Sequence, residues 1–566
     1  MKLGYADLHC HPMAHLAFGG ERKGRSLFWG EPMAPIAEAL PSCAPAHGFL
    51  HQSGGVWRLL PLILDHELAG GGFDSFSNWP RFHTRIHQQM HIMQVYRAYR
   101  SGLRLMVACA VNNELLADKY HGVHRSNSDA SVIDAQLDGI AAMVEANRHW
   151  MTIVRRPEDA WSALNNNKLV VILGIEVDSI AGPEMRWDGQ LAIEDVDAIV
   201  EGWWNKGVRL LHPVHLADNA LGGTAVYNDY FNFLNHYLIK KHARRQGTSW
   251  FLQVDDAAEQ ADTEDIRFKL GSPWAYSLAY DWRGRYRPSY PDAARQSGHV
   301  NRRGLSEAGE AFLLSMMRRG MLIDVEHMSN RTLHDALRIA TRFRYPLFST
   351  HTAIRSLAVT PPKDGSFTDG CAHEAMRSDE DLMAIQELGG MLGIGCHLGL
   401  TKGLDVDAST SWTRAYQYAV HELGFTSVGI GTDMNGFAQA PGPRFGGDPV
   451  SPSPRWKRDP IRHINYGSDT IPLSSKVLDQ AGLGRRSFDF NFDGLAHYGL
   501  LPDFTVDVAL SLGYRSPLTT QREMTPFFTS ANAVVAAWST CVTQSRALGL
   551  QQARRPSRVE EGRAWP

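Results

Sequence analysis

The sequence predicts an α/β fold, a (β/α)8 barrel of the TIM type, from two observations. Eight apolar runs of strand length occur along the chain, and most are separated by segments whose apolar residues have helical spacing. The runs are continuously apolar, which is typical of parallel strands buried on both faces. Eight such units are the pattern of a closed barrel. A doubly wound open sheet is the alternative, but no Gly-rich dinucleotide fingerprint follows the first run.

The predicted strands begin almost at the N-terminus and continue to residue 432. They lie at residues 5–12, 103–111, 169–175, 208–215, 321–327, 347–352, 391–397 and 427–432. The predicted helices lie at residues 80–100, 128–149, 192–205, 305–319, 329–343, 379–388 and 411–423. Ser306 and Ser329 stand where two of these helices begin, and serine is a favoured helix N-cap.

Long stretches between these elements exceed the length of ordinary loops. We expect a single barrel domain over residues 1–566, with insertions at about 13–79 and 216–303. An extended C-terminal region, at about 437–566, follows the last predicted strand.

Composition narrows the range of partners. Lys plus Arg number 57 and Asp plus Glu 60, so the net charge of -3 gives no electrostatic reason to expect nucleic acid. No apolar stretch reaches the roughly 18 residues that a membrane span needs, and no signal peptide is visible. The six cysteines are scattered, which favours free thiols in a reducing compartment. We therefore expect a cytoplasmic protein without membrane insertion.

The first predicted strand carries a pair of histidines. His9 and His11 are separated by one residue, so on a strand they point to the same side while Cys10 points away. Two imidazoles side by side suit a divalent metal such as zinc. With 25 histidines in the chain, however, such a pair alone is weak evidence.

Further polar residues stand at the ends of other predicted strands. They are Glu176, His215, His327, His351 and Asp433. Taken singly, a strand-end histidine is more often a packed or capping residue than a ligand, and an aspartate there usually begins a turn. A barrel brings the carboxyl ends of all its strands into one ring, where its active site lies. The repeated coincidence therefore predicts a metal site at that end of the barrel.

These strand ends lie within longer motifs that match a known family. The motifs are Asp7–Pro12 (DLHCHP), Leu173–Glu176 (LGIE), Arg303–Ser306 (RGLS), Gly320–Ser329 (GMLIDVEHMS), Phe348–Thr352 (FSTHT) and Val428–Gly436 (VGIGTDMNG). Together, and in this order, they resemble the membrane (renal) dipeptidase family of the amidohydrolase superfamily. The resemblance covers roughly residues 5 to 436 and leaves the insertions and most of the tail uncovered.

The resemblance implies two zinc ions per chain. One would be held by His9 and the residue at position 11, the other by His327 and His351, with Glu176 as the bridging ligand. Asp433 would be the acid/base residue beside a bridging water. Two cations that share a water lower its pKa and supply hydroxide near neutral pH.

The chain departs from the family pattern at the first strand. The family usually has His-x-Asp, whereas this chain has His9-x-His11. Replacing a carboxylate by a neutral imidazole makes the site one charge more positive, which favours a more anionic substrate.

The substrate-binding residues are less clearly matched. Arg355 or Arg377 is expected to substitute for the Arg-Asn pair that the family uses to hold the substrate carboxylate, and Asn435 is a further candidate. On the fourth strand, His215 is preferred to His212 for steadying the oxyanion, because it lies nearer the strand end.

The leading hypothesis is a zinc-dependent hydrolase of dipeptides or related small N-acyl amino acids, acting through a metal-bridging hydroxide. One alternative is a metal hydrolase of lactones, esters or phosphoesters from the same superfamily. Another is a barrel that has lost catalysis and serves as a binding or scaffold protein, against which Asp433 argues. A homodimer is an expectation that comes from the family.

Overall fold

The structure is a computed structural model. It describes residues 3–19, 26–44, 71–77, 79–113, 117, 128–180, 191–226, 254–256, 299–359, 371–396, 408–444, 463–474, 476–513 and 517–553.

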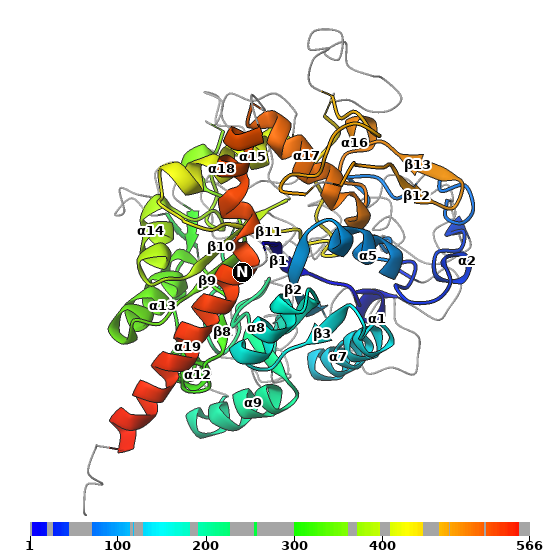
Figure 1. The fold of residues 1–566 in the computed structure, drawn as a ribbon. Helices are drawn as coiled ribbons and strands as arrows, with labels where there is room; N and C mark the ends of the chain where they lie inside the picture. Colours follow the sequence, from blue (N-terminus) through cyan, green and yellow to red (C-terminus); the bar gives the residue numbers. More distant parts are fainter. Residues whose placement is uncertain are drawn as a thin grey trace, which may run out of the picture.

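Eight parallel strands form the barrel that the sequence predicts. They are β1 (Tyr5–Cys10), β2 (Leu103–Asn112), β4 (Leu169–Val177), β5 (Val208–Leu211), β8 (Leu322–Ile323), β9 (Phe348–Thr352), β10 (Met391–Gly395) and β11 (Gly429–Gly431). Their order in the sheet is β8-β5-β4-β2-β1-β11-β10-β9. Figure 1 shows the strands gathered at the centre of the molecule with helices around them.

The two ends of this sheet meet just beyond β8. Asp324 forms a parallel bridge with Phe348, and the backbone N–H of Val325 donates to the carbonyl of Phe348 at 2.8 Å. A ninth strand, β3 (Met151–Ile153), pairs with the first part of β4, before β5 takes over that edge at Leu173. The sheet is therefore a barrel, and the prediction of this fold is confirmed.

Helices follow the strands around the outside of the barrel. They are α5 (Ile92–Arg100), α7 (Asp129–Ala146), α8 (Pro157–Asn165), α9 (Ile193–Asn205), α12 (Glu307–Arg318), α13 (Asn330–Phe343), α14 (Asp379–Glu387) and α15 (Ala408–His421). The side chains of Ser306 and Ser329 cap α12 and α13, as the sequence predicts. Ser128 and Ser378 cap α7 and α14 in the same way, so serine begins four of these helices.

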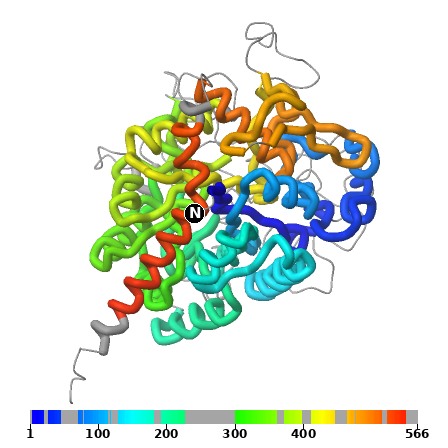
Figure 2. Tube along the Cα trace, in the orientation of Figure 1, coloured from blue at the N-terminus to red at the C-terminus, as the bar shows by residue number. Residues whose placement is uncertain are grey.

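The C-terminal helices close the amino end of the barrel. In α18 (Pro517–Phe528), the carbonyl of Phe528 accepts the N–H of Gly4 at 2.7 Å. In α19 (Ser530–Ala553), the hydroxyl of Ser530 accepts the N–H of Ala6, and the Trp538 indole donates to the Gly320 carbonyl at 3.1 Å. Figure 2 shows α19 crossing beside the N-terminus. In the part of the chain that the structure describes, these helices thus cover the amino ends of β1 and β8.

Another C-terminal segment packs on the first third of the chain. It contains the hairpin β12 (Ala481–Leu483) and β13 (Arg486–Phe488), followed by α16 (Phe490–Asp493), η6 (Tyr498–Leu500) and α17 (Leu501–Ser511). Figure 1 places these elements beside α5 and α2 (Ile36–Ala39). The side chain of Arg97 on α5 forms an ion pair with Asp503 of α17 at 2.5 Å.

The structure corrects some predicted boundaries. A helix was expected over residues 80–100, but α5 begins at Ile92, because the His91 side chain caps it and Gln94 completes the capping box. The short strand β3 and the helix α8 were missed, although Pro157 and the acidic residues after it are typical of a helix start. His397, the expected end of the seventh strand, lies outside the described residues.

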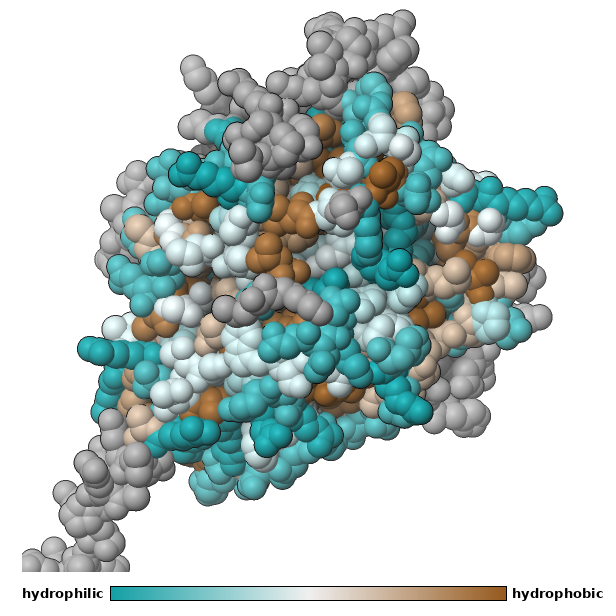
Figure 3. Space-filling view, viewed as in Figure 1, coloured by the Kyte–Doolittle hydropathy of each residue, from teal (hydrophilic) through white to brown (hydrophobic). Residues whose placement is uncertain are grey.

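The surface around α19 mixes hydrophilic and hydrophobic residues without one dominant apolar area (Figure 3). Within the described ranges, no helix combines the length and the hydropathy that crossing a bilayer requires.

Candidate metal centre

The end of β1 presents two imidazoles to the mouth of the barrel. The Nε2 atoms of His9 and His11 are 3.0 Å apart, and both side chains are buried. Cys10 points elsewhere, and its thiol donates to the carbonyl of Val107 at 3.4 Å. The strand alternation therefore places both rings on the same side, as the sequence predicts.

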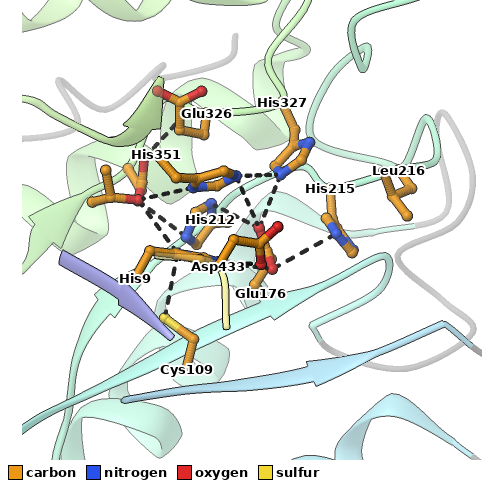
Figure 4. Close-up of polar contacts among 12 residues, drawn as sticks. His9, Cys109, Glu176, His212, His215, Leu216, Glu326, His327, His351 and Asp433 are labelled. Atoms are coloured by element: carbon orange, nitrogen blue, oxygen red, sulfur yellow. Dashed lines mark hydrogen bonds and ion pairs between the residues drawn. The ribbon is translucent and has the colours of Figure 1, made fainter. Parts of the chain in front are cut away.

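Glu176, near the end of β4, lies between two pairs of histidines, and Figure 4 shows it beside His9, His327 and His351. Its Oε2 atom is 3.2 Å from Nε2 of His9 and 3.3 Å from Nε2 of His11. Its Oε1 atom is 2.9 Å from Nε2 of His327 and 3.8 Å from Nε2 of His351. Each carboxylate oxygen thus faces a different pair, which is the geometry of a bridging ligand.

The second pair comes from two neighbouring strands. The Nε2 atoms of His327 and His351 are 3.0 Å apart. His351 lies on β9, but His327 follows β8 by four residues and has a φ of 62°, where the sequence predicted continuing strand. Left-handed backbone is rare for a residue with a side chain and recurs at functional sites.

Asp433 completes the first group from the end of β11. Its Oδ1 atom is 3.1 Å from Nε2 of His11 and 3.9 Å from Nε2 of His9. The side chains of Asp433 and His327 are 14% and 13% exposed, whereas Glu176 is 3% exposed. Solvent therefore reaches the centre from the side of Asp433 and His327.

Partners behind the rings fix the direction of their lone pairs. Nδ1 of His11 is 3.0 Å from the carbonyl of Cys109, which only accepts, so this nitrogen carries the hydrogen. Nδ1 of His351 is 3.2 Å from Oγ1 of Thr350, whose hydrogen is donated to Asp324. In the neutral rings, Nε2 then points its lone pair into the centre. This arrangement of outer partners is common around metal-bound histidines.

Such a convergence of lone pairs and carboxylates fits divalent cations. His9, His11, Glu176 and Asp433 form one group of possible ligands, and Glu176, His327 and His351 form another. Imidazole nitrogen and carboxylate oxygen are ligands that zinc and similar divalent metals accept. The residues present therefore fit a metal cofactor, and two groups sharing one carboxylate suit two ions.

Electrostatics inside the centre are dominated by burial and by the close contacts. Burial would raise the pKa of Glu176, but the surrounding imidazoles, His9 foremost, hold it well below its usual value. Burial would lower the pKa of His11, yet Asp433 and Glu176 raise it to about 10. Positive charge is thus strongly favoured between these carboxylates, whether protons or metal ions supply it.

The two histidines after β5 differ in depth. His212 is fully buried, with Nε2 3.0 Å from Oδ2 of Asp324 and Nδ1 3.8 Å from Oε1 of Glu176. His215, beyond Pro213, is closer to the surface, and its Nε2 is 3.8 Å from Oε2 of Glu176. Burial lowers the pKa of His215 well below its usual value. Of the two, His215 is better placed to meet a substrate.

Two of the predicted substrate-binding residues, Arg377 and Asn435, hydrogen-bond to other groups of the protein. The guanidinium of Arg377 is fully buried and donates to the carbonyls of Val325 and Met328, at 2.7 and 3.0 Å. It thereby holds the turn that carries His327. Its contact with a substrate carboxylate stays a prediction.

Asn435 is also committed within the protein. Its amide donates to the carbonyl of His11 at 3.1 Å and to Gln88, and accepts the N–H of Gln89. Arg355 donates to Asn330 and to the carbonyl of Met376, and its role toward a substrate stays a prediction. Cys109, Asp324 and Thr350 were not predicted as site residues, although Asp324 and Thr350 lie within the matched motifs.

A known protein family matches a segment of the chain that contains part of this site. The family "Membrane dipeptidase (Peptidase family M19)" matches residues 283–443, which contain His327, His351 and Asp433. His9, His11 and Glu176 lie outside the matched segment.

Two similar proteins are fungal. A dipeptidase of Aspergillus oryzae, aclJ, is 29% identical over 140 residues, which are 24% of this chain and 29% of that protein. The uncharacterized dipeptidase C965.12 of Schizosaccharomyces pombe is 27% identical over 152 residues, 26% of this chain and 32% of that protein. The chain thus spans about a third of the length of these relatives.

Among solved structures, the probable dipeptidase PvdM from Pseudomonas aeruginosa has a TM-score of 0.43 and 13% identity, covering 81% of this chain and 89% of that one. An amidohydrolase from Pseudomonas aeruginosa has a TM-score of 0.41 and 15% identity, covering 79% and 93%. Structural likeness at this level carries no argument about function. The functional argument therefore rests on the geometry of the site and on the sequence match to the family.

Proposed function

We infer that this protein is a metal-dependent hydrolase of the membrane dipeptidase type. We propose that it cleaves the amide bond of dipeptides or related small N-acyl amino acids. The observation that carries the proposal is Glu176, whose two carboxylate oxygens face different histidine pairs, with Asp433 at the accessible edge.

We propose zinc as the metal and two ions per chain. His9 and His11 would hold one ion, His327 and His351 the other, and Glu176 would contact both. When bound, two such ions polarise a scissile carbonyl and make a water acidic enough to attack near neutral pH.

Asp433 is the proposed proton carrier. Its carboxylate lies beside His11, and its side chain is the most exposed of the six that surround the centre, so substrate and water reach it. A carboxylate in this place accepts the proton of the attacking water and passes it to the leaving nitrogen. The amide nitrogen needs that proton, because it leaves only as an amine.

His215 is the proposed donor to the developing oxyanion. The edge of its ring that carries Nε2 faces the centre, on the side of Oε2 of Glu176. A preorganised donor of this kind stabilises the charge that appears on the carbonyl oxygen in the transition state.

The test replaces Asp433 by Asn, which preserves shape and removes the proton acceptor. With both proteins loaded with zinc, we expect Asp433→Asn to lower kcat on the best dipeptide by about 10² to 10⁴. KM and metal content are expected to stay near the wild-type values. Asp159→Asn, a change to an exposed carboxylate on α8, is the control that keeps full activity.

Three outcomes would change the proposal. Wild-type kcat in Asp433→Asn with metal bound would require another proton carrier. Loss of metal from that variant would make Asp433 a ligand. Hydrolysis of lactones, esters or phosphoesters, but of no dipeptide in a complete library, would replace the substrate class.

A further inference from the structure

We propose that Asp178 is a positioning residue that orients the His215 ring toward the reacting carbonyl. The inference rests on the proposed function and assigns a second carboxylate at the end of β4 to the same site. Asp178 follows Glu176 by two residues and is buried, with 5% of its surface exposed. None of the proposed catalytic steps uses it so far.

Asp178 first fixes the backbone beside His215. Its Oδ1 atom accepts the N–H of Leu216 at 2.9 Å, so the carboxylate holds the residue that directly follows His215. Its Oδ2 atom accepts a hydrogen bond from the side chain of Asn113 at 2.9 Å, which keeps the carboxylate itself in one orientation.

A second connection holds the same loop from the other side. The side chain of Asn219 donates to the carbonyl of Asp178 at 3.1 Å and to the carbonyl of Pro213 at 2.8 Å. The loop that carries His215 is therefore tied to the end of β4 on both sides of the histidine. The backbone of His215 is thus held in place, and the orientation of the ring depends on the contacts of the ring itself.

The ring itself lies between the carboxylates of Asp178 and Glu176, and Figure 4 shows it beside Glu176. Nδ1 of His215 is 3.5 Å from Oδ1 of Asp178, and Nε2 is 3.8 Å from Oε2 of Glu176. In the part of the chain that the structure describes, Nδ1 has no hydrogen-bond partner, and Asp178 is the carboxylate that faces it. A contact of this length tightens readily when substrate binds.

Orientation by Asp178 decides which edge of the ring faces the substrate. When Oδ1 of Asp178 carries a hydrogen and donates it to Nδ1 of His215, the single hydrogen of the neutral ring is on Nε2 and points to the centre. That hydrogen is the one that donates to the oxyanion. Without Asp178, the ring is free to rotate or to exchange its hydrogen to Nδ1, and the donor is lost in part of the molecules.

The test is a double-mutant cycle with Asp178→Asn and His215→Ala. Asp178→Asn keeps Oδ1 as the acceptor for Leu216, so the loop retains its attachment. We expect this variant to lower kcat on the best dipeptide by about 10 to 10² times, below the effect of removing a whole oxyanion donor. KM and metal content are expected to stay within about threefold of the wild type.

The cycle separates positioning from a merely structural role. In the His215→Ala background, Asp178→Asn is expected to cause no further loss, because its effect passes through the ring. The matched control is Asp129→Asn, a buried carboxylate that bonds Asn112 and the N–H of Ser179. That control is expected to keep kcat within about threefold of the wild type. Full additivity in the cycle, or wild-type kcat in Asp178→Asn, overturns the proposal.

A crystal structure of Asp178→Asn beside the wild type gives a readout that does not depend on activity. We expect the His215 ring to turn away from its wild-type orientation while Leu216 and the metal ligands stay in place. If the wild type cleaves no dipeptide but the ring turns, the proposed function fails and the positioning role stands. An unchanged ring with unchanged kcat overturns the positioning role alone.

Discussion

At the scale of single residues, the centre depends on unusual backbone conformations. His327, Asp433 and Asn435 have φ values of 62°, 47° and 70°. Residues with side chains adopt this region at a cost and keep it where the surroundings enforce it. For Asp433 the enforcing neighbours include the carbonyl of His9, which accepts its N–H at 2.9 Å. The positions of His327 and Asp433 are therefore built into the turns that follow their strands.

Gly436 offers a direct test of this turn. A Cβ atom added there would lie 1.8 Å from Oδ1 of Asp433 and 2.9 Å from Cδ2 of His11. Gly436→Ala is therefore expected to displace the Asp433 carboxylate and to lower kcat by about 10², the typical cost of a misplacement of 1 Å. The measurement is steady-state kinetics with metal analysis of the same samples.

The control for this change is Gly482→Ala on β12, where an added Cβ meets nothing within 4 Å. It is expected to keep wild-type kinetics. Full activity of Gly436→Ala would show that the Asp433 carboxylate is not confined as the structure has it.

At the scale of elements, apolar runs predicted all eight barrel strands, but not where the strands end. The fourth was expected to reach His215, yet β5 ends at Leu211, since Pro213 has no N–H to donate to a ladder. The helix expected over residues 80–100 begins only at Ile92, because Gln88 and Gln89 hydrogen-bond to the distant Asn435. Local spacing does not contain such long-range bonds.

The buried His497 of the C-terminal segment is expected to make the stability of the protein depend on pH. Burial, together with the charges of Arg97 and Arg486, holds the pKa of His497 well below its usual value, so the folded protein keeps the ring neutral. The unfolded chain binds a proton below about pH 6.5, so the free energy of unfolding falls as the pH falls below that value. This histidine alone lowers the free energy of unfolding by about 1.4 kcal/mol between pH 7.5 and 5.5.

His497→Asn tests this because its side chain can still accept the N–H of Gly499, as Nδ1 of His497 does at 3.1 Å. Urea unfolding of the metal-free proteins at pH 7.5 and 5.5 is expected to show a smaller loss for the variant. His463→Asn, at an exposed histidine, serves as the control and should lose as much as the wild type. An equal loss in both variants contradicts a neutral, buried His497.

At the scale of the whole molecule, barrel closure brings together residues that are far apart in the sequence. His9 and Asp433 stand 424 positions apart, yet Oδ1 of Asp433 is 3.9 Å from Nε2 of His9 and 3.1 Å from Nε2 of the neighbouring His11. The order of the motifs predicted His9, His11, Glu176, His327, His351 and Asp433 as one cluster, because parallel strands share a carboxyl end.

What the sequence did not predict are the groups that orient this cluster. Cys109 contributes a backbone carbonyl, which no side-chain pattern reveals. Asp178 and Arg377 act on turns whose course depends on the packed loops around them. That Arg377 binds substrate stays a prediction, and nothing in the sequence indicates that its guanidinium donates to carbonyls of the chain.

The central claim, a centre of two metal ions bridged by Glu176, is tested most directly by a crystal structure of the zinc-loaded protein with anomalous diffraction data. We predict two anomalous peaks per chain, about 3.5 to 4 Å apart, one beside His9 and His11 and the other beside His327 and His351. Glu176→Gln is expected to weaken both peaks together, since one carboxylate serves both pairs. A fully active protein with a single peak, or with no peak at these histidines, would contradict the account.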